Sequence, residues 1–414
     1  MSGLGGGARA RRRGGLPGAG PDDSPRLRCR AGPGHAPRHR GGRAVHRDAR
    51  APARPPRLLL VSPVLLALLA AALAAPTEVS GAHVGHVQGP SWAPGGARIA
   101  YEVNDHEGKT VRLFTVAPGD PPRPVVSGGS PTSLTAGFRR STAPPIAHEL
   151  AWSPPALARF VFTRGGAGAA QDLHIQDVGP VAVAPGADGG ADWSADGRWI
   201  VFTSSRSGQG DLYRLDTQDL SAPPERLTTD AGAAELSARI APDSRRVVYV
   251  AHTDRGDNLF LLPDLTRPTS PTSLTPWPGA QVRPTWSPDG QHIAFYANHE
   301  DRDRWDLVVL SKGGRVTVHA RGVVLNQRGP TWTPDGRALI AVLDDDDRFD
   351  PVVHVPLFQP DALRVLATDT VGNQDTDVTQ DESGRTWLAL TAQGRTGDVR
   401  RAYRKLYVMQ LDEP

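Results

Sequence analysis

The sequence predicts an all-β protein folded as a β-propeller of seven four-stranded blades, with six blades as the alternative. One pattern returns seven times after residue 80: a strand ending in Trp or a substitute, a Pro-Asp-Gly-like turn, and a second apolar strand. From Trp193 onward the copies begin about 46 residues apart. Such a period is typical of propellers, because a four-stranded sheet buries both faces only when neighbouring sheets stack around an axis. The copies begin at Trp92, Trp152, Trp193, Ile240, Trp286, Trp332 and Val378.

Within each unit, the turn predicts a hairpin between the innermost strand and the second. Pro fixes φ, Asp bonds its own backbone, and Gly takes the left-handed conformation. Runs of β-branched and aromatic residues then predict further strands. The clearest are second strands at 199–202 and 247–250, third strands at 211–216, 258–262 and 306–310, and fourth strands at 226–228 and 273–275. The longer first unit is attributed to an irregular loop over residues 127–145. The seventh copy lacks both Trp and Pro, which leaves the six-bladed alternative open.

The two ends of the repeat region are predicted to close the ring. Val79 and Ser80 precede the first Trp as Leu274 and Thr275 precede a later one, and the last unit stops after a third strand at 405–409. We therefore expect residues 77–80 to form the outermost strand of the last blade. Closure of this kind removes the exposed edge of an open array.

Three regions differ in composition. Residues 1–57 hold 14 Arg and three Asp, whereas residues 58–414 carry 33 basic against 41 acidic side chains. The first region has few large apolar residues and is expected to be a disordered tail. Residues 58–75 are apolar behind a basic flank, which predicts the core of a signal peptide or, if uncleaved, a membrane anchor. The propeller is expected over residues 77–414.

This arrangement places the propeller outside the cytoplasm and argues against nucleic acid as the partner of the Arg-rich tail. The tail is too long for an ordinary signal peptide, so one hypothesis starts translation at Val45 and leaves residues 1–44 untranslated. The single cysteine, Cys29, lies in the tail. No disulfide is therefore expected in the propeller.

Motifs for catalysis are not found. The sequence has no Gly-x-Ser-x-Gly elbow, His-Glu-x-x-His pair, phosphate-binding loop or calcium loop. The acidic run 344–347 is interpreted as a solvated loop, and His83 with His86 lacks a third metal ligand nearby in sequence. The turn Asp and the repeated Trp recur too regularly for catalysis and are interpreted as a turn-former and a filler of the wedge between blades. We therefore expect no catalytic residue, metal or cofactor.

The candidate binding residues are the polar side chains that precede the innermost strands. In a propeller, these segments gather around the mouth of the central channel and form a composite surface. The predicted partner-binding residues are His86, Gln88, Gln281, Arg283, Asn326, Gln327, Arg328, Gln374 and Asp375, with His148, Glu149, Glu235 and Asn373 at equivalent places. Their mixed Gln, Asn and Arg chemistry favours a protein or peptide partner over a metal-dependent reaction.

The pattern Trp-Ser-Pro-Asp-Gly-x-x-Ile-Ala-Phe, with Asp-Leu-Tyr-x-x-Asp and x-Leu-Thr after it, resembles the WD40-like (PD40) repeats of the TolB family over about residues 78–412. The resemblance implies a periplasmic, non-enzymatic propeller that binds the peptidoglycan-associated lipoprotein at its channel mouth, within the Tol–Pal system. Members of that family carry an α/β domain before the propeller, and no such segment is expected in this chain. The implied role is therefore a TolB-like propeller whose partner is undefined. Similar repeats occur in prolyl oligopeptidase-like enzymes, whose catalytic domain has no counterpart in this sequence.

Together these observations predict a monomeric, non-enzymatic propeller that is periplasmic or otherwise extracytoplasmic. It is expected to bind a protein or peptide, such as an outer-membrane lipoprotein, and to contact a membrane only through residues 58–75. The alternative is a propeller hydrolase or lyase that acts on a glycan or small ester, with a metal in its channel.

Overall fold

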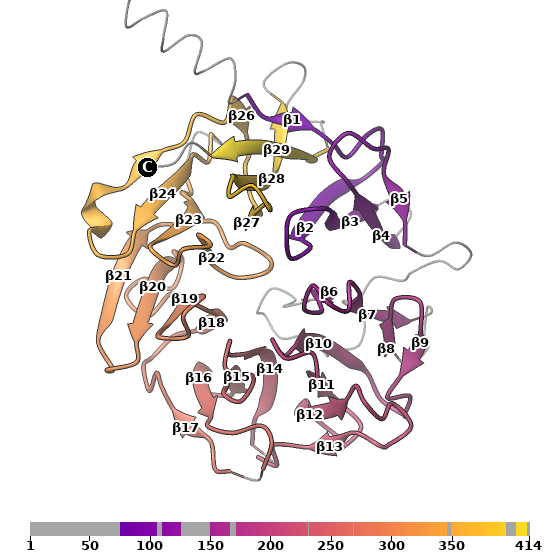
Figure 1. The fold of residues 1–414 in the computed structure, drawn as a ribbon. Helices are drawn as coiled ribbons and strands as arrows, with labels where there is room; N and C mark the ends of the chain where they lie inside the picture. Colours follow the sequence, from indigo (N-terminus) through magenta and orange to yellow (C-terminus); the bar gives the residue numbers. More distant parts are fainter. Residues whose placement is uncertain are drawn as a thin grey trace, which may run out of the picture. The chain divides into compact units, whose positions relative to one another are not determined.

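The computed structural model describes residues 75–105, 110–125, 150–165, 171–230, 232–267, 269–345, 349–394 and 403–411. These residues form seven antiparallel sheets that follow one another around a central axis (Figure 1). The prediction of a seven-bladed propeller is therefore confirmed, and the six-bladed alternative is wrong. The weak seventh copy also forms a full blade of paired strands, although it lacks the Trp and the Pro.

In each blade the first strand lies next to the axis and the last lies at the rim. Blade 1 holds β2 (His86–Trp92), β3 (Ile99–Asp105), β4 (Thr110–Val116) and β5 (Arg123–Pro124); blade 2 holds β6 (Leu150–Trp152), β7 (Phe160–Gly165), β8 (Gln171–Ile175) and β9 (Gly179–Val181); blade 3 holds β10 (Asp188–Trp193), β11 (Trp199–Ser204), β12 (Asp211–Asp216) and β13 (Glu225–Arg226). Blade 4 holds β14 (Ala234–Ile240), β15 (Val247–Thr253), β16 (Gly256–Leu262) and β17 (Thr272–Ser273); blade 5 holds β18 (Gln281–Trp286), β19 (His292–Ala297), β20 (Asp306–Ser311) and β21 (Val316–Arg321).

Blades 6 and 7 complete the ring. Blade 6 holds β22 (Thr331–Trp332), β23 (Ala338–Val342), β24 (Val352–Pro356) and β25 (Arg364–Val365), with the short 3-10 helix η1 (Pro360–Ala362) before β25. Blade 7 holds β27 (Thr376–Gln380), β28 (Thr386–Gly394), β29 (Lys405–Leu411) and β1 (Thr77–Glu78), and β26 (Thr370–Val371) also pairs with β28.

The repeated turn closes as its residue types predict. In blade 5 the Ser287 hydroxyl donates to Oδ1 of Asp289 at 2.5 Å, and the amide of Gly290 donates to the Ser287 carbonyl at 2.8 Å. Blade 6 repeats both bonds with Thr333, Asp335 and Gly336. The turn Asp is therefore engaged by its own turn, which confirms its structural role.

The ring closes through the N-terminal strand, as expected. Thr77 pairs with Val408 and Glu78 with Tyr407, and the amide of Val79 donates to the Leu406 carbonyl at 2.9 Å. Ser80 Oγ accepts from the Leu406 amide at 3.1 Å. Blade 4 has the same two bonds at Leu274 and Thr275, so residues 77–80 are the fourth strand of blade 7.

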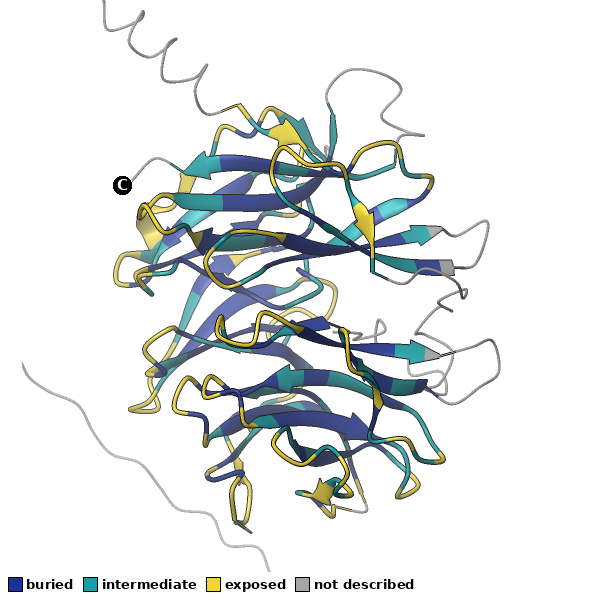
Figure 2. Cartoon of the chain, turned by 45° about the vertical axis from the view of Figure 1, so that its right-hand side comes forward, coloured by how far each residue is buried: buried dark blue, intermediate teal, exposed yellow. Residues whose placement is uncertain are grey.

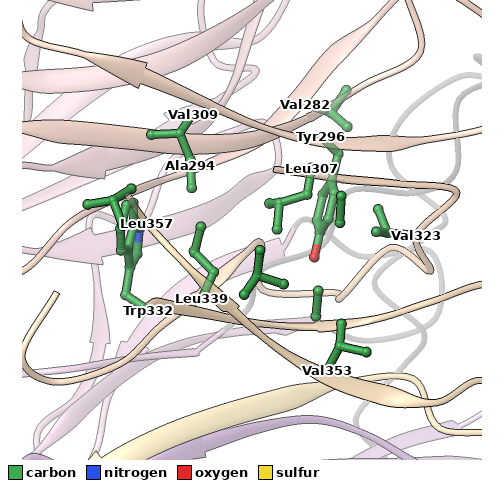
Figure 3. Close-up of a cluster of buried hydrophobic side chains, with 13 residues drawn as sticks. Val282, Ala294, Tyr296, Leu307, Val309, Val323, Trp332, Leu339, Val353 and Leu357 are labelled. Atoms are coloured by element: carbon green, nitrogen blue, oxygen red, sulfur yellow. The ribbon is translucent and has the colours of Figure 1, made fainter. Parts of the chain in front are cut away.

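The core lies between the blades. Figure 2 shows the strands buried through their middle lengths and the connecting loops exposed. In the cluster of Figure 3, Trp332 and Leu339 of blade 6 pack against Ala294 and Val309 of blade 5. Trp92 packs in a similar cluster with blade 7 residues, so the repeated ring fills the wedge between one blade and the preceding one.

Several sequence-based expectations lie outside the described residues. These are the tail with Cys29, residues 58–74 of the apolar segment, the loop at 127–145, His148, Glu149, Asp346 and Asp347. Over the ranges that the structure describes, no helix has the length and apolar character needed to cross a membrane.

Candidate functional site

A shared backbone irregularity shapes the mouth of the channel. Four innermost strands shift register three residues before their Trp or its substitute. The residue there has a left-handed φ of 53–61° and is Gly89, Gly190, Ser237 or Arg283. A bulge of this kind bends the strand and redirects the residues before it. Two of the four positions, Ser237 and Arg283, hold a side chain where glycine would relieve the backbone strain. The Arg283 side chain is held in place, because its Nη1 donates to the Asn326 carbonyl at 2.8 Å.

Blade 6 departs from the other blades, because its innermost strand is only two residues long. The preceding segment, residues 324–330, is fastened by the buried side chain of Asn326. Its amide donates to the Thr376 carbonyl at 2.7 Å and to Thr331 Oγ1 at 2.9 Å. Gln327 and Arg328 are thereby presented by a segment that is tied to blade 7.

Gly329 lets this segment pass close to blade 5. Its φ is 98°, and a Cβ placed on it would lie 2.7 Å from the Arg283 carbonyl oxygen. Gly384 is a matched control, since its φ is 82° and an added Cβ would meet nothing within 4 Å. We expect Gly384→Ala to cost about 1 kcal/mol of unfolding free energy through backbone strain alone. Gly329→Ala is expected to cost about 3 kcal/mol, measured by urea unfolding, because the clash adds to the strain. Equal losses would show that the close approach is not required.

Asp375 joins three blades at the mouth. Its side chain is fully buried. Oδ1 accepts from the Gln327 amide at 2.7 Å, and Oδ2 accepts from the Gly89 amide at 3.1 Å. Asp375 therefore fixes the segments that carry Gln88 and Gln327 relative to one another.

Next to this junction lies a buried carboxyl group, Glu102 of β3. Nε2 of Gln88 donates to its Oε2 at 3.1 Å. Burial raises the pKa of Glu102 from 4.5 to about 7, an effect that the hydrogen bond from Gln88 and the charge of Arg328 partly oppose. Near neutral pH, Glu102 is thus present in both its protonated and its ionised form.

Charged side chains of both signs also lie in the channel. The Arg328 guanidinium interacts with the charges of Asp377 and Asp192 as well as Glu102, and Arg239 interacts with Asp192. Burial raises the pKa of Asp377 to about 6, although Arg328 opposes that rise. A cavity of about 380 Å³ lies against these groups, and its polar lining includes Ser91, Arg239, Thr285, Arg328, Thr331 and Asp377.

The two channel aspartates also connect blades. Asp192 Oδ2 accepts from the Ile240 amide at 2.7 Å, and Asp377 Oδ2 accepts from the Trp92 amide at 2.6 Å. Each occupies the position directly before the Trp or its substitute. Because their carboxylates are held by neighbouring blades, the charges that face Arg328 are fixed in place.

The structure brings only some of the nine predicted residues together at an accessible surface. Gln88, Gln327 and Arg328 surround the mouth and are half-buried. His86 and Gln374 are half-buried too, and His86 Nδ1 accepts from the Arg404 amide at 3.2 Å. The remaining four, Gln281, Arg283, Asn326 and Asp375, are buried. Gln281, for example, accepts from Asn258 at 2.7 Å. The expectation that all nine side chains form one surface is therefore too broad, because these four are buried and used for internal hydrogen bonds.

Four channel residues were not predicted from the sequence: Glu102, Asp192, Arg239 and Asp377. Three of them, Asp192, Arg239 and Asp377, stand directly before the Trp or its substitute, so a comparison of that one position across the copies identifies them. Glu102 lies on a second strand and has no such signal.

The candidate metal positions have other partners. His83 Nε2 lies 2.9 Å from the Tyr101 hydroxyl, and its ring packs 4.3 Å from that of Phe114. Asp345 Oδ1 accepts from the amides of Phe349 and Asp350 at 2.8 and 3.1 Å, as in a folded loop. Within the described ranges, no group of three His, Cys, Asp or Glu side chains is arranged to hold a metal ion.

Comparison with known proteins identifies the repeat type. Residues 151–334 match the family described as the TolB beta propeller domain. An uncharacterized protein of Agrobacterium fabrum is 33% identical over 119 residues, which are 27% of this chain and 40% of that protein. The Tol-Pal system protein TolB of Alcanivorax borkumensis is 30% identical over 98 residues, which are 23% of this chain and 22% of TolB. The matches thus span less than half the length of these curated relatives.

Among solved structures, oligogalacturonate lyase from Vibrio parahaemolyticus has a TM-score of 0.54 at 9% identity, over 80% of this chain and 91% of the lyase. A likeness at such low identity shows the fold alone. The sequence matches, by contrast, extend to the repeat pattern itself. The chain is therefore a seven-bladed β-propeller, and its repeats over residues 151–334 match the TolB beta propeller domain.

Proposed function

We propose that this protein is a non-enzymatic, extracytoplasmic binding module that holds a protein or peptide segment at the mouth of its channel. The observation that carries the proposal is the segment 324–330, which presents half-buried Gln327 and Arg328 from a fixed backbone. A preorganised segment loses little conformational entropy on binding, and Arg is frequent among the residues that dominate interface energies.

The charge pattern supports a peptide over a simple ion. Arg328 and Arg239 interact with the charges of Asp192, Asp377 and Glu102, so donors and acceptors lie near one another in the channel. A peptide offers amide donors, carbonyl acceptors and charged side chains of either sign, and can satisfy both kinds of group. Glu102 also adapts to its ligand, because its pKa of about 7 allows it to donate or accept.

The location and the class of partner are inferred from the relatives. The TolB of Alcanivorax borkumensis is described as a Tol-Pal system protein. That likeness supports the proposal of an analogous place in the periplasm, with an envelope protein such as an outer-membrane lipoprotein as partner. The basic and apolar residues before position 77 fit such a location, as part of a signal peptide or anchor.

A crosslinking pull-down from the native cell envelope tests this function. The bait is the intact protein, compared with a Gln327→Ala/Arg328→Ala variant. The matched control is Arg315→Ala/Gln359→Ala, which removes the same two residue types from exposed positions on blade 5 and before η1. We expect the mouth variant to lose about tenfold in partner recovery, because an Arg at a desolvated contact is commonly worth about 1.4 kcal/mol or more.

The control variant is expected to recover the partner as the wild type does. Thermal unfolding of each bait checks that the fold is intact. Equal recovery by both variants would remove the mouth as the binding site. Turnover of a pectin-like glycan or a small ester by the wild type, lost in the mouth variant, would replace the binding function with an enzymatic one.

A further inference from the structure

Several of the seams between neighbouring blades are sealed by the repeated turns. A Cβ placed on Gly336 would lie 3.4 Å from Cδ of Pro288, in the turn of the preceding blade, and Gly290 meets Pro242 at the same distance. Between blades 7 and 1, Gly96 meets Thr379 at 3.2 Å. A Cβ on Gly384 of blade 7, however, would have nothing within 4 Å. The seam between blades 6 and 7 is therefore open.

A cavity of about 680 Å³ occupies this open seam. It is lined by both blades, including Pro334, His354 and Leu366 of blade 6 and Gln380, Met409 and Leu411 of blade 7. Its volume lies within the range of about 300–1,000 Å³ that is usual for small-molecule sites. None of its lining residues belongs to the channel cavity or to the mouth.

The open seam has a direct cause in the sequence. The turn of blade 6 keeps its proline, Pro334, but this residue lines the cavity and has no glycine against it. In blade 7 the glycine Gly384 comes six residues after Val378, the substitute for Trp, whereas in blade 6 Gly336 comes four residues after Trp332. Gly384 is thereby displaced from the place that Gly336 and Gly290 take in their own seams.

The apolar part of the lining is accessible. Leu366 and Leu411 are half-buried, and Val365 at the outer edge of blade 6 is 66% exposed. Phe358 and Leu363, on the segment that leads to β25, are also exposed. Apolar side chains that gather at an open cavity are a common mark of a binding site.

The polar part of the lining is cationic. Arg337 and Arg364 both line the cavity, and within the described chain neither forms an ion pair with a carboxylate. The one acidic side chain in the lining, Asp335, has its Oδ1 occupied by Thr333 Oγ1 at 2.6 Å and by the Arg337 amide at 3.0 Å. His354 adds a buried Nδ1 that has no hydrogen-bond partner.

We propose that the cavity between blades 6 and 7 binds an amphipathic organic carboxylate, with its apolar chain against Leu366, Met409 and Leu411 and its carboxylate paired with Arg337 and Arg364. Two guanidinium groups match a carboxylate in charge and in hydrogen-bond geometry. Burial and the charge of Arg364 lower the pKa of His354, so this side chain is neutral at neutral pH and its imidazole is available as a hydrogen-bond partner. This site is separate from the mouth, so it and the proposed function are tested independently.

Calorimetric titration of the full-length protein with decanoate tests the site, with decylammonium as a probe of the same chain length and opposite charge. We expect decanoate to bind and decylammonium not to bind at concentrations up to about 1 mM. Arg337→Gln/Arg364→Gln is expected to weaken decanoate binding about tenfold, since two partly exposed ion pairs contribute up to about 1 kcal/mol each. Ala367→Trp, at an exposed position in the lining, is expected to block the cavity.

Arg315→Gln on blade 5 is the control and is expected to bind decanoate as the wild type does. The proposal is overturned if the wild type does not bind decanoate, or if Ala367→Trp and the double Arg variant both bind it unchanged. Equal binding of decanoate and decylammonium would also overturn it, because the cations would then have no role. Partner recovery in the pull-down is expected to stay the same in all of these variants.

Discussion

Deletion of residues 77–80 is expected to lower the free energy of unfolding by about 3–5 kcal/mol and to make the protein aggregate. The deletion removes the pairing of Thr77 and Glu78 with β29, the bond from the Val79 amide, and the bond to Ser80 Oγ. Each net hydrogen bond contributes about 1 kcal/mol, and Val79 also packs against the core between blades 7 and 1. The edge of β29 is then open to pairing with another chain.

Two proline variants distinguish the effect of ring closure on stability from the effect of losing a single backbone hydrogen bond. Val79→Pro removes an amide that donates to the Leu406 carbonyl at 2.9 Å, and Leu274→Pro removes the equivalent bond to Leu259 at 2.8 Å in blade 4. Only the first of these bonds joins the two ends of the propeller. We expect both variants to be destabilised, with the larger loss and visible light scattering for Val79→Pro. Urea unfolding and scattering on heating are the measurements, and equal behaviour would show that closure adds nothing to an ordinary outer strand.

The blade architecture could be predicted because each copy encodes its own turn. The Ser-Asp and Gly-Ser bonds at Ser287 and Asp289 depend on residues within four positions of one another, and they recur in blade 6. The closing strand was also predictable, because Val79 and Ser80 repeat the residue types of Leu274 and Thr275 and make the same bonds. Hydrogen bonds between residues that are close in sequence and recur in several copies can therefore be predicted from the repeated residue types.

The site could be predicted only in part, because it depends on contacts between blades. The sequence predicts both Gln281 and Arg328 at the start of an innermost strand. Gln281, however, accepts a hydrogen bond from Asn258, whereas Arg328 lines the channel cavity. What separates them is the backbone of segment 324–330, which Asn326 fastens to Thr376 some 50 residues away. The open seam likewise follows from a glycine that is displaced relative to a neighbouring blade. The residue pattern within one copy does not predict such contacts, because they depend on how neighbouring blades are placed.

Glu235 gives the protein a stability that depends on pH. This residue of β14 is 1% exposed, its Oε2 is buried without a hydrogen-bond partner, and the buried carboxylate of Asp211 lies near it. Burial, followed by the charge of Asp211, raises the pKa of Glu235 from 4.5 to about 8. Between these two values the folded protein keeps a proton that the unfolded chain releases. The contribution of Glu235 to the free energy of unfolding is therefore fully present below pH 4.5. It falls by about 1.4 kcal/mol per pH unit as the pH rises toward 8.

Glu235→Gln is expected to remove the part of this dependence that Glu235 causes, because the amide resembles the protonated acid in shape and has no proton to lose. The variant and the wild type should differ little in slope below pH 4.5, and the variant should gain about 2–4 kcal/mol relative to the wild type by pH 8. Urea unfolding at intervals from pH 4.5 to 8.5 measures the difference, and any constant offset from the substitution cancels. Parallel curves for the two proteins would contradict the assignment.

Asp211→Asn tests how far the charge of Asp211 raises the pKa of Glu235. Asp211 forms an ion pair with Arg226 at 2.7 Å, so its removal leaves a guanidinium without its carboxylate and is expected to destabilise the fold at every pH. It also removes the negative charge that helps to raise the pKa of Glu235. The fall in stability with rising pH should therefore end at a lower pH in Asp211→Asn than in the wild type, although the variant is less stable overall. Loss of stability with a fall that ends at the same pH would show that burial alone raises the pKa of Glu235.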